Sequence, residues 1–148
     1  MPGVSTLGGA SQPCETDHVA SSHSVLVVDD QAQFRLAAKA VLRRLDEFEL
    51  AGEASSGHEA VELADRLHPE LVLMDINMPQ MSGIEATREI LAAHPDTIVI
   101  LCSTYDVRDL PADAGASGAA GYVNKEQFGI DMLRRIWAHR EDGWPGSD

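Results

Sequence analysis

The chain has few basic residues, few aromatic residues and few cysteines. Its 148 residues include 11 Lys and Arg against 24 Asp and Glu, a formal net charge of -13, and only 5% are aromatic. A surface with this excess of acidic residues repels nucleic-acid phosphates and anionic lipid headgroups. We therefore expect no direct binding of nucleic acid or of a membrane. The two cysteines, Cys14 and Cys102, are too few for a disulfide framework and suit a reducing compartment.

Long apolar runs and a basic N-terminal stretch are also missing. The first basic residue is Arg35, so the pattern of a secretory signal peptide is absent. No apolar run approaches the roughly 20 residues that a membrane-spanning helix needs. We therefore expect a cytoplasmic protein. The length, with 44% hydrophobic residues, is enough for one compact domain and too short for two.

The two ends of the chain contain few apolar side chains. Residues 1–23 are rich in Ser, Gly, Pro and Thr, and residues 141–148 are mostly polar. Such segments bury too little apolar surface to offset the entropy of ordering them. The sequence therefore predicts a flexible leader over 1–23, a folded domain over 24–140 and a polar tail over 141–148.

Within the folded part, short apolar runs alternate with stretches of helical periodicity. The runs that predict strands are 25–28, 48–54, 71–74, 97–102 and 119–123. Each is followed by a helical stretch, although 106–118, which contains Pro111 and Gly115, is a poor helix former. This alternation predicts an α/β fold of five βα units, in which right-handed crossovers place helices on both faces of a parallel sheet.

Polar side chains follow four of the five predicted strands. Asp29 and Asp30 follow the first, Asp75 the third, Ser103 the fourth and Lys125 the fifth. In a parallel sheet these strand ends meet at one edge, where ligands bind. Three carboxylates close together repel one another unless a cation neutralises them, and an all-oxygen site favours a hard cation. We expect Mg²⁺, which commonly combines one or two carboxylates with phosphate oxygens.

The same set of residues predicts phosphoryl chemistry. A carboxylate can attack phosphorus and form an aspartyl phosphate, and Asp75 is the candidate nucleophile because it lies between the Asp pair and the lysine. Lys125 and Ser103 would surround the phosphoryl oxygens. A single Asp after a strand is more often a helix cap, and a single Lys is usually a surface residue. It is the complementary set at four strand ends that favours a functional site.

Four segments carry a resemblance to a known family. These segments are VLVVDD at 25–30, LVLMDINMPQMSG at 71–83, ILCST at 100–104 and GYVNK at 121–125. In this order they make the chain, from 24 to 140, resemble the receiver domain of two-component response regulators. The resemblance implies a flavodoxin-like three-layer sandwich with a five-stranded parallel sheet of strand order 2-1-3-4-5. It also implies that Asp75 accepts a phosphoryl group from a sensor histidine kinase or a histidine phosphotransfer protein.

The resemblance further implies roles for individual residues around the metal ion. Asp30 and Asp75 would bind Mg²⁺ directly, the backbone carbonyl of Asn77 would be a third protein ligand, and Asp29 would act through water. All four positions match the family pattern in the segments quoted above.

Three other residues would act on the phosphoryl group and report its presence. Lys125 would pair with the phosphate, and Ser103 would hydrogen-bond a phosphoryl oxygen and shift. Tyr122, three residues before Lys125, resembles the switch aromatic of the family, which turns inward in response. The switch would change a partner-binding face.

We therefore expect a stand-alone signalling receiver, which assists its own phosphorylation and dephosphorylation but is not an enzyme. Its output would be binding of an unknown downstream protein, and a homodimer formed on phosphorylation is left open. Only eight residues follow the last predicted helix. The alternative is the receiver of a DNA-binding transcriptional regulator, suggested by Glu126 after Lys125, where many receivers have proline.

Two other classes fit less well. An aspartyl-phosphate hydrolase of the haloacid dehalogenase type usually has a second Asp two positions after the nucleophile, where this chain has Asn77. A flavodoxin needs a hydroxyl-rich phosphate loop after the first strand, whereas Asp29 and Asp30 would repel the flavin phosphate.

Overall fold

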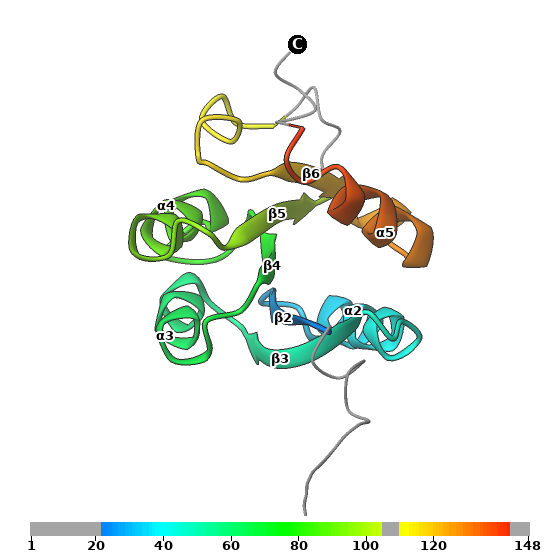
Figure 1. Cartoon of the computed structure of the whole chain (residues 1–148). Coiled ribbons are helices and arrows are strands. Elements are labelled where there is room, and N and C mark those ends of the chain that lie inside the picture. The colour runs from blue at the N-terminus through cyan, green and yellow to red at the C-terminus, as the bar shows by residue number, and fades with distance from the viewer. Residues whose placement is uncertain (1–21, 105–109, 143–148) are drawn as a thin grey trace, which may run out of the picture.

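Five parallel strands form a single sheet in the computed structural model, which describes residues 22–104 and 110–142 (Figure 1). The strands are β2 (His23–Val28), β3 (Phe48–Ala54), β4 (Leu71–Asp75), β5 (Ile98–Ser103) and β6 (Gly121–Asn124). Their spatial order is β3-β2-β4-β5-β6, which is 2-1-3-4-5 when the strands are counted along the chain. The predicted fold and strand order are confirmed.

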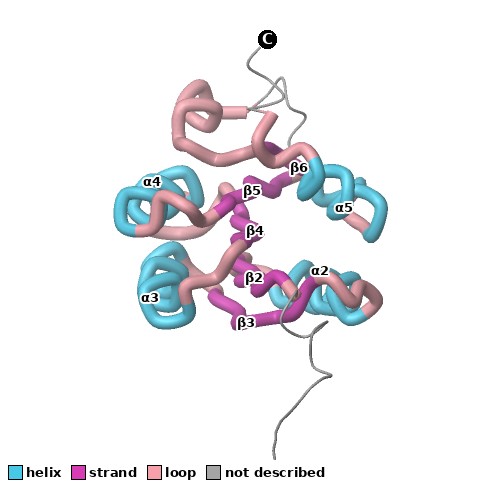
Figure 2. Tube along the Cα trace, viewed as in Figure 1, coloured by secondary structure: helices cyan, strands magenta, loops and turns pink. Residues whose placement is uncertain are grey.

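Helices cover both faces of the sheet and complete a three-layer sandwich (Figure 2). Within residues 22–104 and 110–142 the helices are α2 (Ala32–Arg43), α3 (Gly57–Leu67), α4 (Gly83–Ala93) and α5 (Ile130–Ala138), and a 3₁₀ turn, η3 (Lys125–Gln127), follows β6. In Figure 1, α3 and α4 lie on one side of the sheet, and α2 and α5 on the other. This arrangement follows from right-handed crossovers between parallel strands.

The central strand β2 contributes to both cores. Val25 and Val27 pack with α2 and α5, and Leu26 and Val28 pack with α3 and α4. All four side chains are fully buried, as expected of a central parallel strand that is apolar at each position. Each such side chain stabilises the fold by about 1.5–3 kcal/mol relative to an exposed one.

Strand β3 contains an irregularity that the sequence pattern did not show. Val25 pairs with Leu50, but Leu26 pairs with Gly52, so Ala51 is an extra residue in the pairing of β3 with β2. A bulged residue reverses the alternation of side chains beyond it. As a result, Phe48 packs in the core beneath α2 and α5, whereas Ala54 packs beneath α3 and α4.

Serine residues cap the N-termini of two helices, α3 and α4. Ser56 accepts a hydrogen bond from the Glu59 amide at 3.1 Å at the start of α3, and Ser82 accepts one from the Glu85 amide at 3.2 Å at the start of α4. Each serine satisfies an amide that has no partner within its helix.

The segment between β5 and β6 differs from the other crossovers. Its described part, residues 110–118, consists of turns and contains no helix. Pro111 and Gly118, whose φ is +97°, interrupt helical geometry. Ala114 is the one buried apolar side chain between Pro111 and Gly118, so a helix here would gain little from packing. The weak helix expected over 106–118 is absent from these residues, and residues 105–109 lie outside the described part.

At the chain ends, β2 begins at His23, the last residue of the predicted leader, and α5 ends at Ala138. Residues 1–21 and 143–148, which make up most of the predicted leader and tail, lie outside the described residues. Among the described helices, none combines the length and the apolar character that spanning a bilayer requires.

Candidate phosphoryl and metal site

The polar residues predicted to meet at one edge of the sheet do so. Asp29 and Asp30 directly follow β2, Asp75 is the last residue of β4, and Ser103 is the last residue of β5. Lys125 directly follows β6 as the first residue of η3. Because β2, β4, β5 and β6 are consecutive neighbours in one parallel sheet, their carboxyl ends lie along the same edge.

Lys125 forms ion pairs with two of the three carboxylates. Its ammonium nitrogen lies 2.6 Å from Asp29 Oδ2 and 3.2 Å from Asp75 Oδ1. Both aspartates are buried, and the lysine side chain is only 13% exposed. Burial lowers the pKa of Lys125, but the hydrogen bond to Asp29 and the charge of Asp75 outweigh it and raise this pKa above its ordinary value. The lysine is therefore a permanent cation at the site.

The three carboxylates form a cluster that one lysine does not neutralise. An oxygen of each of Asp29, Asp30 and Asp75 lies within 4.8 Å of an oxygen of the other two. Burial, with the charges of Asp29 and Asp30, raises the pKa of Asp75 from 3.8 to about 7 in spite of the opposing effect of Lys125. The pocket thus binds a proton at Asp75 more tightly than water-exposed aspartate does, as expected where negative charge is in excess.

This donor set fits a hard divalent cation. All three groups offer carboxylate oxygens, and no His or Cys joins the cluster within the described residues. Mg²⁺ uses oxygen ligands and keeps part of its water shell, and the exposed carboxylate of Asp30 leaves one side open to water. Asn77 lies two residues beyond Asp75, in the exposed loop that leads to α4.

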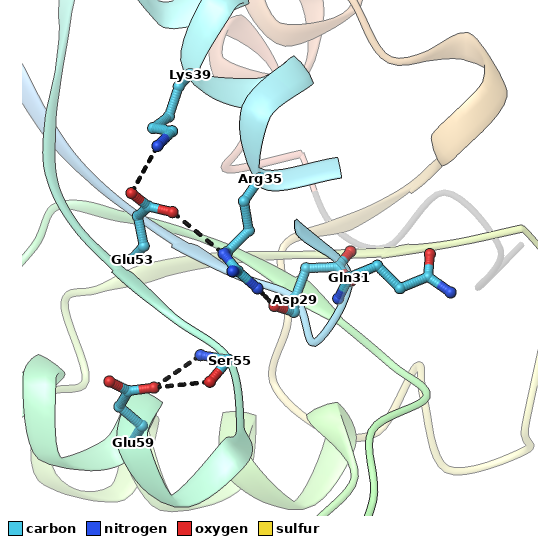
Figure 3. Close-up of polar contacts among 7 residues, drawn as sticks. All are labelled: Asp29, Gln31, Arg35, Lys39, Glu53, Ser55 and Glu59. Carbon is cyan, nitrogen blue, oxygen red and sulfur yellow. Dashed lines mark hydrogen bonds and ion pairs between the residues drawn. The ribbon is translucent and has the colours of Figure 1, made fainter. Parts of the chain in front are cut away.

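The first aspartate is held at several atoms (Figure 3). The Gln31 amide donates to Asp29 Oδ1 at 2.8 Å, and the Asp29 amide donates to the Ala54 carbonyl at 3.0 Å. With the Lys125 ion pair on Oδ2, each polar group of the side chain has a defined partner. Asp29 is consequently a fixed element of the site, whereas the neighbouring Asp30 is exposed.

A glycine lets the following helix approach Asp75. The Gly83 amide donates to the Ile76 carbonyl at 2.9 Å, and a Cβ atom at Gly83 would overlap the Asp75 carbonyl oxygen. The loop from Ile76 to Ser82 therefore folds tightly against the end of β4. Gly83 is required for this close backbone approach, a role that the sequence pattern does not indicate.

The hydroxyl groups of Ser103 and Tyr122 are in contact. Ser103 Oγ lies 3.0 Å from Tyr122 Oη, and the tyrosine hydroxyl also donates to the Ser103 carbonyl at 3.1 Å. Ser103 is buried and Tyr122 is half-buried. The tyrosine predicted as a switch thus lies against the serine predicted to contact a phosphoryl group.

An aromatic pair supports the lysine and was not recognised from the sequence. The Lys125 ammonium lies 5.0 Å from the centre of the Phe34 ring, which packs against Phe128 with a centroid distance of 5.4 Å. A cation over a ring face gains about 0.5–2 kcal/mol, depending on how far it is desolvated. Phe34 packs against the core beneath α2 and α5, and its contact with the lysine depends on tertiary packing.

The comparisons with known proteins agree with this geometry. The family model of the response regulator receiver domain matches residues 25–137. The chain is 37% identical over 112 residues to the transcriptional regulatory protein DegU of Brevibacillus brevis, a match that covers 76% of this chain and 48% of DegU. It is 40% identical over 101 residues to the chemotaxis protein CheY of Thermotoga maritima, a match that covers 68% of this chain and 83% of CheY.

A solved structure of the CheX-CheY-BeF3-Mg²⁺ complex from Borrelia burgdorferi matches with a TM-score of 0.71 at 25% identity, covering 78% of this chain and 87% of that chain. The chain spans about half the length of relatives such as DegU. Motif order, strand order and clustered acidic residues agree with the family match over most of the chain, and the protein belongs to the response regulator receiver domain family.

Proposed function

We propose that this protein is a phospho-acceptor that takes a phosphoryl group onto Asp75 with the help of Mg²⁺. The observation that carries the proposal is the pairing of a buried aspartate with a half-buried lysine at 3.2 Å, inside a cluster of three carboxylates. In this arrangement the carboxylate can attack a phosphoryl group, and the lysine can neutralise its charge.

In the proposed reaction, a carboxylate oxygen of Asp75 attacks the phosphorus of a phosphohistidine. A new P–O bond forms while the P–N bond to the imidazole breaks, and the departing imidazole takes up a proton. Lys125 would move from Asp75 towards the phosphoryl oxygens, where its charge stabilises the transition state. Its second ion pair, to Asp29 at 2.6 Å, keeps the ammonium within the pocket during this exchange.

Asp29, Asp30, Asp75 and the backbone carbonyl of Asn77 would hold the metal ion, directly or through water. When bound, Mg²⁺ would neutralise the excess negative charge of the carboxylates and of the incoming phosphoryl oxygens. The similar Borrelia complex combines CheY with both Mg²⁺ and BeF3, which supports this assignment.

The switch would be the contact between Ser103 and Tyr122. A phosphoryl oxygen on Asp75 would accept a hydrogen bond from Ser103 and so compete with Tyr122 for its hydroxyl group. The tyrosine would re-pack at the surface formed by β5, β6 and α5, a local change of charge that biases a two-state element. A partner that prefers one packing would then respond to phosphorylation.

The donor would be a sensor histidine kinase or a histidine phosphotransfer protein, and the protein itself would be a signalling component in the cytoplasm, not an enzyme acting on a separate substrate. A stand-alone receiver and the receiver of a DNA-binding regulator both fit, because the relatives include CheY and the transcriptional regulator DegU. The length of the native reading frame decides between them.

Intact-mass measurement after incubation with acetyl phosphate and Mg²⁺ tests the proposal. The wild-type protein should gain the mass of one phosphoryl group, and Asp75→Asn should gain none. Asp96→Asn, a change at an exposed aspartate just before β5 and away from the carboxyl ends of the strands, is the matched control and should be labelled like the wild type. Equal labelling of the Asp75 variant would remove that residue from the role.

A further inference from the structure

Arg35 links the Asp29–Asp30 turn to the neighbouring edge strand (Figure 3). Its Nη1 donates to the Asp29 carbonyl oxygen at 2.6 Å, and its Nε donates to Glu53 Oε1 at 3.1 Å. The side chain is 21% exposed, so the guanidinium is held mainly by protein groups. A planar guanidinium can serve two acceptors at a fixed angle, which an ammonium group cannot do.

The carbonyl that Arg35 holds belongs to the peptide group leading into Asp30. Because a peptide group is planar, fixing its oxygen fixes the direction in which the chain enters the next residue. The Gln31 amide, which donates to Asp29 Oδ1, also constrains the turn around Asp30, but Arg35 is the side chain that holds the Asp29 carbonyl oxygen itself. The Asp30 side chain is exposed to solvent, so its direction depends mainly on the backbone before it.

We propose that Arg35 is a positioning residue for Mg²⁺: by holding the Asp29 carbonyl, it aims the Asp30 carboxylate at the metal site. The inference rests on the proposed function. Arg35 lies within α2 and acts through the backbone, so it would neither touch the ion nor take part in phosphoryl transfer.

Glu53 anchors the arginine, and the bulge at Ala51 makes this possible. Beyond the bulge, Ala54 faces α3 and α4, so the preceding Glu53 faces α2. There Lys39 Nζ donates to Glu53 Oε2 at 2.8 Å while Arg35 takes the other oxygen. Hydrogen bonding to Lys39, with a further contribution from Arg35, lowers the pKa of Glu53. The acceptor for the arginine therefore stays ionised at neutral pH.

Residues that orient a metal ligand from outside typically change metal affinity about 10- to 100-fold when removed. We expect Arg35→Gln to weaken Mg²⁺ binding by about tenfold, because Asp30 loses its preferred direction but remains present. Lys39→Gln is the matched control: it removes the other cation from Glu53 and leaves the Asp29 carbonyl bond intact. It should change the affinity by less than about twofold.

The dissociation constant is measured by following backbone amide shifts of Asp30 and Gln31 in ¹⁵N-labelled protein during Mg²⁺ titration, with thermal unfolding recorded for each variant. Weaker binding in Arg35→Gln alone, with similar melting temperatures for the two variants, supports the inference. Affinity within twofold of the wild type overturns it, and so does equal weakening in both variants, because the effect would then run through Glu53.

Should Arg35→Gln not fold, Arg35→Lys is tested by the same criteria. This variant keeps the positive charge opposite Glu53 but loses the planar guanidinium that bonds Glu53 and the Asp29 carbonyl together. A loss of about threefold or more supports the inference, and a wild-type affinity overturns it. A wild-type protein without any Mg²⁺-dependent shifts would refute the proposed metal site and this inference together. Normal wild-type binding with unaffected Arg35 variants would refute the inference alone.

Discussion

The hydroxyl group of Tyr122 lies 3.0 Å from that of Ser103, and both groups are at the sheet edge that holds the carboxylate cluster. Tyr122 Oη also donates a hydrogen bond to the backbone carbonyl of Ser103 at 3.1 Å. A residue that forms two hydrogen bonds to a single serine will respond when that serine changes partner. If a phosphoryl group on Asp75 engages Ser103 as proposed, Tyr122 is the next side chain to respond.

Two substitutions at this contact should act in opposite directions on binding of the phosphoryl analogue beryllofluoride. In Tyr122→Phe the Ser103 hydroxyl no longer has to leave the tyrosine, so we expect affinity to rise severalfold, with a stability loss of about 1 kcal/mol. In Ser103→Ala the hydroxyl needed by the analogue is gone, so affinity should fall. Titration followed by NMR measures both.

The two variants control for each other, because each removes the hydroxyl–hydroxyl contact. A change of the same sign in both would show that loss of this contact alone, rather than competition for Ser103, alters binding.

Removal of the lysine should destabilise the protein in a way that Mg²⁺ partly reverses. Lys125→Ala leaves two buried aspartates without their cation, which we expect to lower the free energy of unfolding by roughly 3 kcal/mol at about pH 8. A divalent ion among the same carboxylates stabilises the folded state by mass action. Urea unfolding with and without a saturating concentration of Mg²⁺ checks this.

Lys39→Ala is the control, because its partner Glu53 lies outside the cluster; Mg²⁺ should restore little of its loss. The same Lys125 variant should also bind beryllofluoride without the amide shifts around Tyr122 that the wild type shows. An unchanged response at Tyr122 would contradict the role of the lysine in coupling the phosphoryl site to that surface.

Stability should depend on pH through Asp75. Its pKa is about 7 in the folded state against 3.8 for an unperturbed aspartate, so the folded protein binds this proton more tightly than the unfolded chain. The resulting stabilisation is fully present below pH 3.8 and is lost as pH rises through about 7. Without Mg²⁺, Asp75→Asn should therefore be more stable than the wild type above that value, and the advantage should vanish at low pH.

Urea unfolding across this pH range measures the difference in unfolding free energy between Asp75→Asn and the wild type. Asp96→Asn, which changes an exposed carboxylate, should show no such pH-dependent gain in stability. Since a proton and a metal ion compete for Asp75, Mg²⁺ affinity of the wild type should increase as pH rises through about 7. An affinity that stays constant over about one pH unit on either side of that value would contradict this assignment.

Gly83 should be intolerant of even one added methyl group. Its Cβ would overlap the Asp75 backbone oxygen, so Gly83→Ala must displace either α4 or the end of β4. We expect a loss of about 3 kcal/mol in the free energy of unfolding, together with weaker Mg²⁺ binding. Gly129→Ala is the control, because a Cβ there meets nothing within 4 Å; its cost should be about 1 kcal/mol or less.

The local signals in the chain were sufficient for the five parallel strands and for the choice of site residues, whereas the strand order was predicted from the family resemblance. Apolar runs such as 25–28 and 71–74 predict buried strands from composition alone, because few other structures bury four consecutive apolar residues. A polar residue that ends such a run lies at a strand end, so Asp29, Asp75 and Ser103 could be assigned from the sequence. The 106–118 segment was harder, because its alanines favour a helix while Pro111 and Gly118 oppose it.

The residues that support the site were not assigned from the sequence. Phe34 and Arg35 are consecutive in α2, yet one supports Lys125 and the other holds the Asp29 carbonyl. A useful signal would have been the i, i+4 spacing of Arg35 and Lys39, two cations on one side of a helix in an acidic chain. Their partner Glu53 depends on the bulge at Ala51, which composition does not indicate.

The amino-acid sequence by itself determined the five strands and four of the five expected helices along the chain, the aspartates, serine and lysine at the strand ends, and the excess of negative charge that favours a cation among them. These properties depend on residues close together in the sequence, so they can be predicted without knowledge of the packing. Only the tertiary structure decided that Arg35 reaches a carbonyl, that Tyr122 contacts Ser103 and that Gly83 lies against Asp75. Such contacts join elements far apart in the chain, and their geometry follows from strand register and helix placement, which no local pattern specifies.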